Sequence, residues 1–254
     1  MYKRQGYFEY QRRLEMVRAR PPYQPPEAVS DPAGATRTLE AGESAAMLRR
    51  FGISVPQETM AGSAAEASEL ARDIGYPVVL KAPLDGFPHK SDVGLVRTEL
   101  GSAEEVRGAF ESLRARVLEL APDAKSQPIM VQRQAAPGTE VIIGITRDAT
   151  LGAAILVGLG GIFTEVLRDV SVRPLPITGF DAGEMIRELK GFALLEGVRG
   201  TPKADLQALT ETILAVARLA ADPGNRVVEL DLNPVIAGPT GCVAVDSLIV
   251  VATG

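Results

Sequence analysis

The chain has 254 residues, of which 46% are hydrophobic and 23% are charged, and its formal net charge is −5. This length and composition are typical of a globular protein with one large domain or two small ones, and the acidic balance argues against general nucleic-acid binding. No apolar run is long enough to span a membrane and no signal-peptide pattern opens the chain, so we expect a cytoplasmic protein that does not bind membranes.

Residues 1–36 form a separate region at the start of the chain. The apolar residues of its basic first half recur at helical spacing: Tyr7, Tyr10, Leu14 and Val17. This spacing predicts an amphipathic helix, and the proline-rich stretch that follows indicates a linker. Membrane docking or a transit peptide is an alternative, but acidic residues and a lack of serines favour packing on a partner domain or on the body of the chain.

The rest of the chain alternates helical and extended patterns. Ser63 and Ser102 each precede a helical segment and are each followed three residues later by a glutamate, which is the arrangement of a capping box. Further helices are expected over 38–51 and from Thr201 onwards. The expected strands are 77–80, 129–134, 140–146, 153–157, 227–232 and 243–250. These elements predict an α+β or mixed α/β layout without internal repeats.

The only histidine, His89, follows a strand-like run that ends in Lys81. A lysine at the end of an apolar strand can hold a phosphate as a point charge, and a nearby imidazole can accept a phosphoryl group covalently. A lone histidine is more often a structural or surface residue, so this pair does not decide the function by itself. The only cysteine, Cys242, lies in an apolar run and is expected to be a small buried hydrophobe.

Two further patterns are compatible with phosphate and metal binding. The glycines of 158–161 follow an apolar strand and would let backbone amides approach an anion, although such a cluster is more often only a turn. Glu229, Asp231 and Asn233 share one face of a strand, and Asp246 lies on the next strand. Two oxygen ligands with nucleotide phosphates and water commonly hold Mg²⁺, but a half-solvated sheet edge shows the same alternation.

Together these segments resemble the ATP-grasp domain of the NDP-forming acyl-CoA synthetases, which include ADP-forming acetyl-CoA synthetase and, more distantly, the succinyl-CoA synthetase β subunit. The resemblance extends from about Thr38 to the C-terminus, and its specificity lies in the order and spacing of the segments. The matching segments are 75–81, 89–94, 138–140 with Gly144 and Asp148, 158–163 with Glu165 and Asp169, and 231–234 with Asp246. Leu95 departs from the family, in which many members carry a second glycine.

The resemblance implies an α+β, ATP-grasp fold of two α/β lobes that grip a nucleotide, over residues 37–254. The expected smaller lobe covers about 37–135, not strictly contiguously, and the larger one about 136–254. It implies that His89 relays a phosphoryl group and that Asn233 and Asp246 bind Mg²⁺. The implied nucleotide-binding residues, for ATP or ADP, are Lys81, Gln132, Glu140, Gly160 and Gly161. The acidic positions whose roles stay open are Asp148, Glu165 and Asp231.

In that family a phosphohistidine formed from acyl phosphate on the CoA-ligase part passes its phosphoryl group to ADP, or receives it from ATP. The present chain has neither a CoA-binding G-x-G-x-x-G after an early strand nor a second histidine. We therefore expect a β-type subunit, or the C-terminal part of a longer synthetase, that works in a hetero-oligomer with a CoA-ligase subunit or domain carrying the other active-site histidine.

Two other functions stay open at this stage. An ATP-grasp carboxylate ligase that uses acyl phosphate directly has no need of His89. A non-catalytic nucleotide-binding regulatory subunit would keep the Mg²⁺ site for binding alone. The activity of a His89→Ala variant separates these functions from the phosphohistidine relay.

Overall fold

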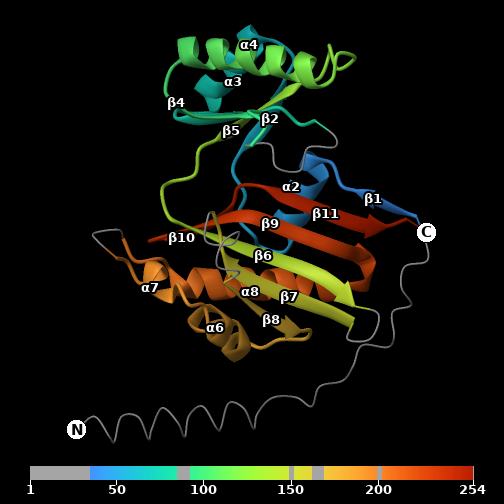
Figure 1. Cartoon of the computed structure of the whole chain (residues 1–254), viewed down its shortest axis with the longest axis vertical. Coiled ribbons are helices and arrows are strands. Elements are labelled where there is room, and N and C mark those ends of the chain that lie inside the picture. The colour runs from blue at the N-terminus through green and yellow to red at the C-terminus, as the bar shows by residue number, and fades with distance from the viewer. Residues whose placement is uncertain (1–34, 85–91, 149–151, 162–168, 199–201, 254) are drawn as a thin grey trace, which may run out of the picture. The chain divides into compact units, whose positions relative to one another are not determined.

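The computed structural model describes residues 35–84, 92–148, 152–161, 169–198 and 202–253 (Figure 1). The chain divides into two compact units. Pro56–Ala136 form the smaller unit, and the described residues before and after this segment form the larger one. The helix and linker expected at the start of the chain lie outside the described residues up to residue 34.

The larger unit is built on an antiparallel sheet of seven strands in the order β1-β11-β9-β6-β7-β8, with β10 paired to β9. Its strands are β1 (Thr36–Thr38), β6 (Thr139–Asp148), β7 (Gly152–Leu159), β8 (Val170–Pro174), β9 (Val227–Gly238), β10 (Gly241–Ala244) and β11 (Ser247–Ala252). Its helices are α2 (Ala41–Arg50), α6 (Gly179–Arg187), α7 (Phe192–Leu195), α8 (Leu206–Ala221) and the short 3-10 helix η1 (Pro223–Asn225).

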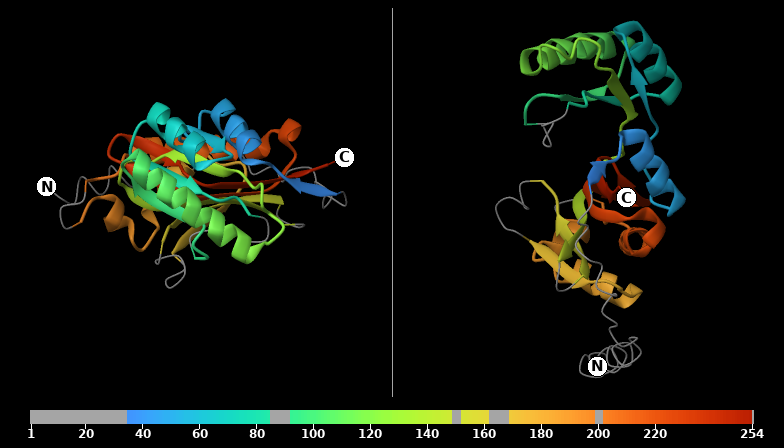
Figure 2. Two further views of the ribbon diagram at one scale, coloured as in Figure 1. Left: turned by 90° about the horizontal axis from the view of Figure 1, so that it is seen from above. Right: turned by 90° about the vertical axis from the view of Figure 1, so that its right-hand side faces the viewer.

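Helices α6 and α8 lie on the same face of this sheet, as the right-hand view of Figure 2 shows. Ile213 and Val216 of α8 are fully buried against Leu230 and Leu232 of β9 in one apolar core. Because side chains alternate along a strand, Asp231, which lies between these leucines, points to the opposite face. The core therefore fixes which side of the sheet carries the polar residues.

The smaller unit is a four-stranded antiparallel sheet in the order β2-β5-β3-β4 with two helices. Its elements are β2 (Glu58–Ala61), α3 (Ala64–Ile74), β3 (Val78–Lys81), β4 (Val96–Leu100), α4 (Ala103–Leu120) and β5 (Ile129–Arg133). The core of this unit includes Leu80, Leu113 and Val131, all fully buried. Leu95 is also fully buried there, which gives this departure from the family pattern a packing role in this chain.

The two serine caps predicted from the sequence are present. The side-chain oxygens of Ser63 and Ser102 accept the backbone N–H of Glu66 and Glu105, at 3.2 Å in each case. Each glutamate carboxylate accepts a backbone N–H at 2.7 Å, from the glycine that precedes the serine. The serine half of the expected capping box is therefore present, whereas each glutamate satisfies the amide of the preceding glycine instead of that of the serine.

Three expected elements differ from the structure. The helix expected over 38–51 begins at Ala41, because residues Thr36–Thr38 pair with β11 as a strand. The helix expected from Thr201 begins at Leu206, where Asp205 accepts the N–H of Ala208 at 2.9 Å. The strand expected over 243–250 is two strands, β10 and β11, with a break between them. Among the described elements, the strands β1, β2, β4 and β8 and the helices α6 and α7 have no counterpart among the expected ones.

The division into lobes differs from the expected one at its first boundary. Residues before Pro56 belong to the larger unit rather than to a lobe of 37–135. The physical reason is that Leu48 and Ile53 are buried in the core of the larger unit and that β1 extends its sheet. The smaller unit is consequently an insertion between α2 and β6.

Candidate functional site

Asn233 and Asp246 face each other in the sheet of the larger unit. The backbone N–H of Asn233 donates to the backbone oxygen of Asp246 at 3.3 Å. The strand pairs on both sides, Val235 with Ala244 and Leu232 with Ser247, continue the same register. Directly opposite residues of antiparallel strands have Cβ atoms about 4.5–5.5 Å apart. The structure therefore brings together the amide and the carboxylate that the sequence predicts as metal ligands.

Asp246 occupies the break between β10 and β11. One of its carboxylate oxygens accepts the N–H of Ser247 at 3.0 Å, and the side chain is partly exposed. Asn233 is likewise partly exposed, whereas Leu232 beside it is fully buried. Both side chains are thus within reach of solvent and of a bound ligand.

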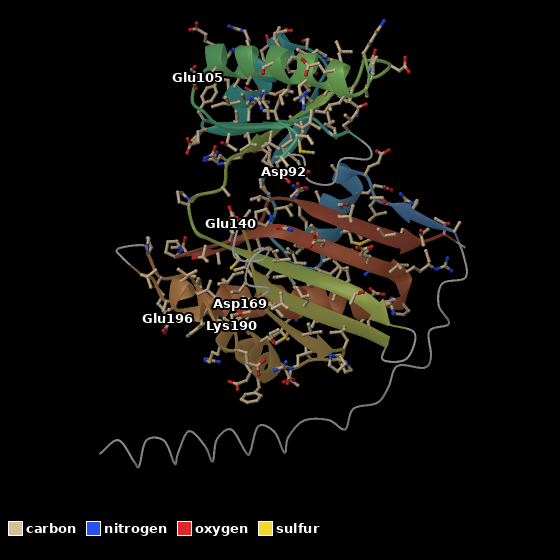
Figure 3. The ribbon with its side chains drawn as sticks, viewed as in Figure 1. Asp92, Glu105, Glu140, Asp169, Lys190 and Glu196 are labelled. Carbon is tan, nitrogen blue, oxygen red and sulfur yellow. The ribbon has the colours of Figure 1, made fainter. Side chains whose placement is uncertain are left out.

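Glu140 lies at the start of β6 (Figure 3), and Gly160 and Gly161, which follow β7, lie beside it. The backbone oxygen of Glu140 accepts the N–H of Gly160 at 2.8 Å. A Cβ atom on Gly160 would lie 2.8 Å from the Cβ of Glu140, and one on Gly161 would lie 3.2 Å from a Glu140 carboxylate oxygen. Gly160 is therefore required by the close approach of β6, while Gly161 is exposed with a left-handed φ of 66°.

These residues lie on one region of the face opposite the core. Glu140 pairs with Ile236 of β9, three residues beyond Asn233. Its neighbour Val141 is fully buried in the core, so the alternation of the strand turns Glu140 to the same face as Asp231 and Asn233. A ligand on this face would meet the carboxylates of Glu140, Asp231 and Asp246 and the amide of Asn233.

The side chains present suit Mg²⁺ held together with a nucleotide. Among the described residues there is no group of three or more histidine, cysteine or acidic side chains that would form a metal cage without other ligands. Mg²⁺ is usually bound by one or two carboxylates, with water and phosphate oxygens as the other ligands. The carboxylate of Asp246 with the amide oxygen of Asn233 meets that requirement.

The smaller unit carries the other predicted nucleotide-binding residues. Lys81 pairs with Met130 and Gln132 pairs with Val79, so Lys81 and Gln132 lie on one face of the four-stranded sheet. Gln132 is 3% exposed, and its side-chain amide donates to a carboxylate oxygen of Glu58 at 2.7 Å. Glu58 was not predicted, because its position beside Gln132 depends on the pairing of β2 with β5.

Asp169 has a structural role that the sequence did not indicate. It is 3% exposed and accepts the backbone N–H groups of Lys190 and Gly191, both at 2.8 Å (Figure 3). A Cβ atom on Gly191 would lie 2.3 Å from the side chain of Leu159, so this chain segment packs tightly at the end of β7. Asp169 thus fixes the start of α7 against the strand that leads into the glycines.

Two predicted residues, His89 and Glu165, lie outside the described residues. The backbone of Asp148 pairs with Gly152 at the far end of β6.

Cys242 is buried, as expected. Burial, reinforced by the charge of Asp205, raises the pKa of its thiol to about 12, so the thiolate is scarce at neutral pH.

A comparison with protein families supports the class of fold that the two units define. The family described as "ATP-grasp domain" matches residues 32–251. The β subunit of acetate–CoA ligase [ADP-forming] II from Pyrococcus furiosus is 39% identical over 210 residues, which are 82% of this chain and 89% of that protein. The chain therefore belongs to the ATP-grasp family, among the β-type subunits of ADP-forming CoA ligases.

Solved structures are similar to the chain over most of its length. Acetyl-coenzyme A synthetase 1 of Ca. Korarchaeum cryptofilum, in complex with coenzyme A and Ca-AMPCP, has a TM-score of 0.80 and 40% identity and covers 85% of this chain and 93% of that one. The same synthetase in complex with coenzyme A and Mg-AMPPCP has a TM-score of 0.71 and 37% identity, covering 84% and 92%, and its phosphohistidine segment points towards the nucleotide binding site. In the described part of the present chain no helix is both long and apolar enough to cross a membrane.

Proposed function

We propose that the chain binds ATP or ADP with Mg²⁺ and transfers a phosphoryl group between the nucleotide and phosphohistidine, as the β-type subunit of an ADP-forming acyl-CoA synthetase. The observation that carries this proposal is the pairing of Asn233 with Asp246 on the face of the sheet that also holds Glu140 and Gly161. Membership of the ATP-grasp family supports the choice of a nucleotide as ligand.

The larger unit provides oxygen ligands and amides for the phosphates. Asp246 and Asn233 would hold Mg²⁺, which neutralises negative charge on the phosphoryl group in transfer. The exposed backbone of Gly161 leaves room for a phosphate beside its amide. The carboxylate of Glu140 lies next to this glycine. Because it would repel the negatively charged phosphates, Mg²⁺ would have to lie between them.

The smaller unit provides the cation and the oriented amide. Lys81 would contact the phosphates as a compact positive charge at the end of β3. The bond from Gln132 to Glu58 orients the side-chain amide of Gln132 on this face of the sheet. Val79 and Met130 lie on the same face and are nearly buried, so they give this face an apolar surface suited to a nucleobase.

His89 would carry the phosphoryl group. In the direction from ATP, a ring nitrogen of His89 forms a bond to the γ-phosphorus as the bond to the β,γ-bridging oxygen breaks, and ADP leaves. The group then passes from His89 to the second histidine, on the CoA-ligase partner, which uses it to make acyl phosphate from the acid. The absence of a second histidine in this chain supports the need for that partner.

The test uses the full chain, alone and mixed with a CoA-ligase subunit of an ADP-forming synthetase. After incubation with ATP labelled at the γ-phosphate and Mg²⁺, we expect an acid-labile, base-stable phosphate on the wild-type chain and none on His89→Ala. Acyl-CoA synthesis should require both subunits and should be lost in His89→Ala. Thr98→Ala, at an exposed position of β4, serves as the matched control and should keep both signals.

Two outcomes would assign the chain to another function. Acyl-CoA or amide synthesis at the wild-type rate by His89→Ala would point to a ligase that uses acyl phosphate directly. Mg²⁺-dependent nucleotide binding without labelling or turnover, with every partner subunit tried, would point to a regulatory subunit.

A further inference from the structure

A cavity of about 380 Å³ lies in the larger unit, away from the residues described above. It is formed by β1, α2 and the end of β11, which are neighbours in Figure 1, and by residues of and next to η1. Among the described residues, the side chains around it include three arginines, Arg37, Arg50 and Arg226, and no aspartate or glutamate. This concentration of positive charge contrasts with the net charge of −5 of the whole chain.

Within the residues that the structure describes, only one of the three arginines forms an ion pair with a carboxylate. Arg37 donates to both carboxylate oxygens of Glu43, at 2.7 and 2.9 Å. This pair lowers the pKa of Glu43 to about 2, so Glu43 keeps its negative charge at any ordinary pH. The positive charge of Arg37 is therefore already balanced in the absence of a ligand.

In the described part of the chain, the positive charges of the other two arginines are not paired with a carboxylate. Arg50 donates to the side-chain oxygen of Asn225, which is a neutral acceptor, and stacks over the ring of Phe51. Within the described part of the chain, the side chain of Arg226 makes no hydrogen bond or ion pair, and its backbone is left-handed with a φ of 49°. Guanidinium groups bind carboxylates and phosphates through paired N–H donors, so this cavity is suited to an anion.

The remaining wall of the cavity is apolar. Leu39 and Val251 are each 8% exposed, and Met47 packs against the same core. Pockets of roughly 300–1,000 Å³ with apolar walls and a few placed polar groups are typical of small-molecule sites. An inorganic ion would make no apolar contact with this wall.

The cavity is distinct from the candidate metal site. Asp246 immediately precedes β11, whereas Val251 and Ala252 line the cavity at the other end of that strand. Five residues of extended chain span about 16 Å, which is longer than a side-chain contact. A ligand in the cavity would therefore not touch Asp246.

We propose that this arginine-lined cavity is a second ligand site, which binds a small organic anion with one oxyanion group, a carboxylate or a phosphate, on an apolar body. The oxyanion group would contact Arg50 and Arg226, and the apolar body would lie against Leu39, Met47 and Val251. Such a site is independent of the nucleotide site and of the reaction proposed above.

The test is calorimetric titration of the full chain with four probes: benzoate, phenyl phosphate, inorganic phosphate and benzyl alcohol. We expect one-to-one binding of benzoate or phenyl phosphate, weaker binding of inorganic phosphate and no binding of benzyl alcohol. Whichever of the first two binds more tightly identifies the oxyanion. Arg226→Gln should weaken that binding by about tenfold or more, because a charge-assisted hydrogen bond is lost.

Two further variants separate binding from folding. Arg187→Gln, at an exposed position of α6 in the same unit, is the matched control and should bind as the wild type does. Met47→Glu places a carboxylate on the cavity wall and should weaken binding without removing an arginine. Thermal unfolding of each variant shows whether it is folded.

The proposal is overturned if none of the probes binds, if Arg226→Gln binds as tightly as the wild type, or if saturating Mg²⁺ and ADP compete with the probe. Equal affinity for inorganic phosphate and phenyl phosphate would refute the role of the apolar wall. Failure of nucleotide binding with intact probe binding would refute the proposed function and leave this site in place.

Discussion

At the scale of single residues, the proposed metal site depends on a backbone hydrogen bond. Asn233 and Asp246 are brought together because β9 pairs with β10 before Asp246 and with β11 after it. The register of the sheet places the amide of Asn233 opposite the carboxylate of Asp246. Substitutions that keep the shape of these side chains should therefore change ligand binding more than stability.

The first prediction follows for Asp246→Asn. This change removes the negative charge that would hold Mg²⁺ and keeps the size of the side chain. We expect the affinity for ADP in the presence of Mg²⁺ to fall by about tenfold or more, with the midpoint of thermal unfolding nearly unchanged. Glu211→Gln removes an equivalent charge from the exposed side of α8 and should leave nucleotide affinity at the wild-type value. Calorimetric titration with and without Mg²⁺ measures both, and equal affinity in Asp246→Asn and wild type would disprove the metal assignment.

At the scale of elements, the ends of strands and helices are set by close packing as much as by local sequence. Gly160 ends β7 against β6, and its missing side chain is what allows the N–H of Gly160 to bond to the backbone of Glu140. The family resemblance implied that both glycines let a phosphate approach the backbone. In the structure Gly160 packs so closely against Glu140 that a side chain would clash, whereas Gly161 is exposed to solvent.

The second prediction concerns Gly160→Ala. Its Cβ would lie 2.8 Å from the Cβ of Glu140 and 3.1 Å from a backbone carbon, so the strand end must shift. Overpacking of this kind costs about 1–3 kcal/mol of unfolding free energy. Gly42→Ala in α2 is the control, because a Cβ there meets no atom within 4 Å and alanine favours helix. Urea unfolding of the two variants should give changes of opposite sign, and a neutral Gly160→Ala would show that the loop adjusts freely.

Helix α8 illustrates a boundary that local signals misplaced. Thr201 and Pro202 have the types expected at a helix start, yet the helix begins four residues later than Pro202. Asp205 is held there because its backbone N–H donates to Gly238 at 2.8 Å, at the end of β9. A contact between residues distant in the sequence therefore decided which of several acceptable caps is used.

At the scale of the whole molecule, the smaller unit is an insertion with its own core. All residues of that core lie between Ala61 and Val131. The first and last strands of the unit, β2 and β5, are antiparallel neighbours, so the chain enters and leaves at one place. The N–H of Arg133 donates to the oxygen of Gln57 at 2.8 Å across this junction.

The third prediction is that a fragment of residues 56–136 folds by itself. Its ends are already paired in the sheet, and its core needs no residue of the larger unit, so excision exposes little apolar surface of that core. We expect cooperative urea unfolding of the fragment with a stability of about 3–5 kcal/mol, as for other small domains. Leu113→Ala, which empties a fully buried position of α4, should abolish or strongly weaken that transition. A fragment without a cooperative transition would mean that the unit depends on the rest of the chain.

The sequence alone determined the features that depend on local spacing. The serine caps of α3 and α4 and the strands around Lys81 and Asn233 were predicted because hydrogen bonding at helix ends and side-chain alternation act over a few residues. The order of the motifs likewise indicated the ATP-grasp family, which the comparisons confirm.

Only the tertiary structure decided what depends on pairing between distant segments. It assigned β1 and α2 to the larger unit, placed Glu58 beside Gln132, made Asp169 a support for α7 and assembled the arginine-lined cavity from both ends of the chain. The physical reason is that sheet register and core burial are set by contacts between strands and helices far apart in the sequence, which local patterns do not encode.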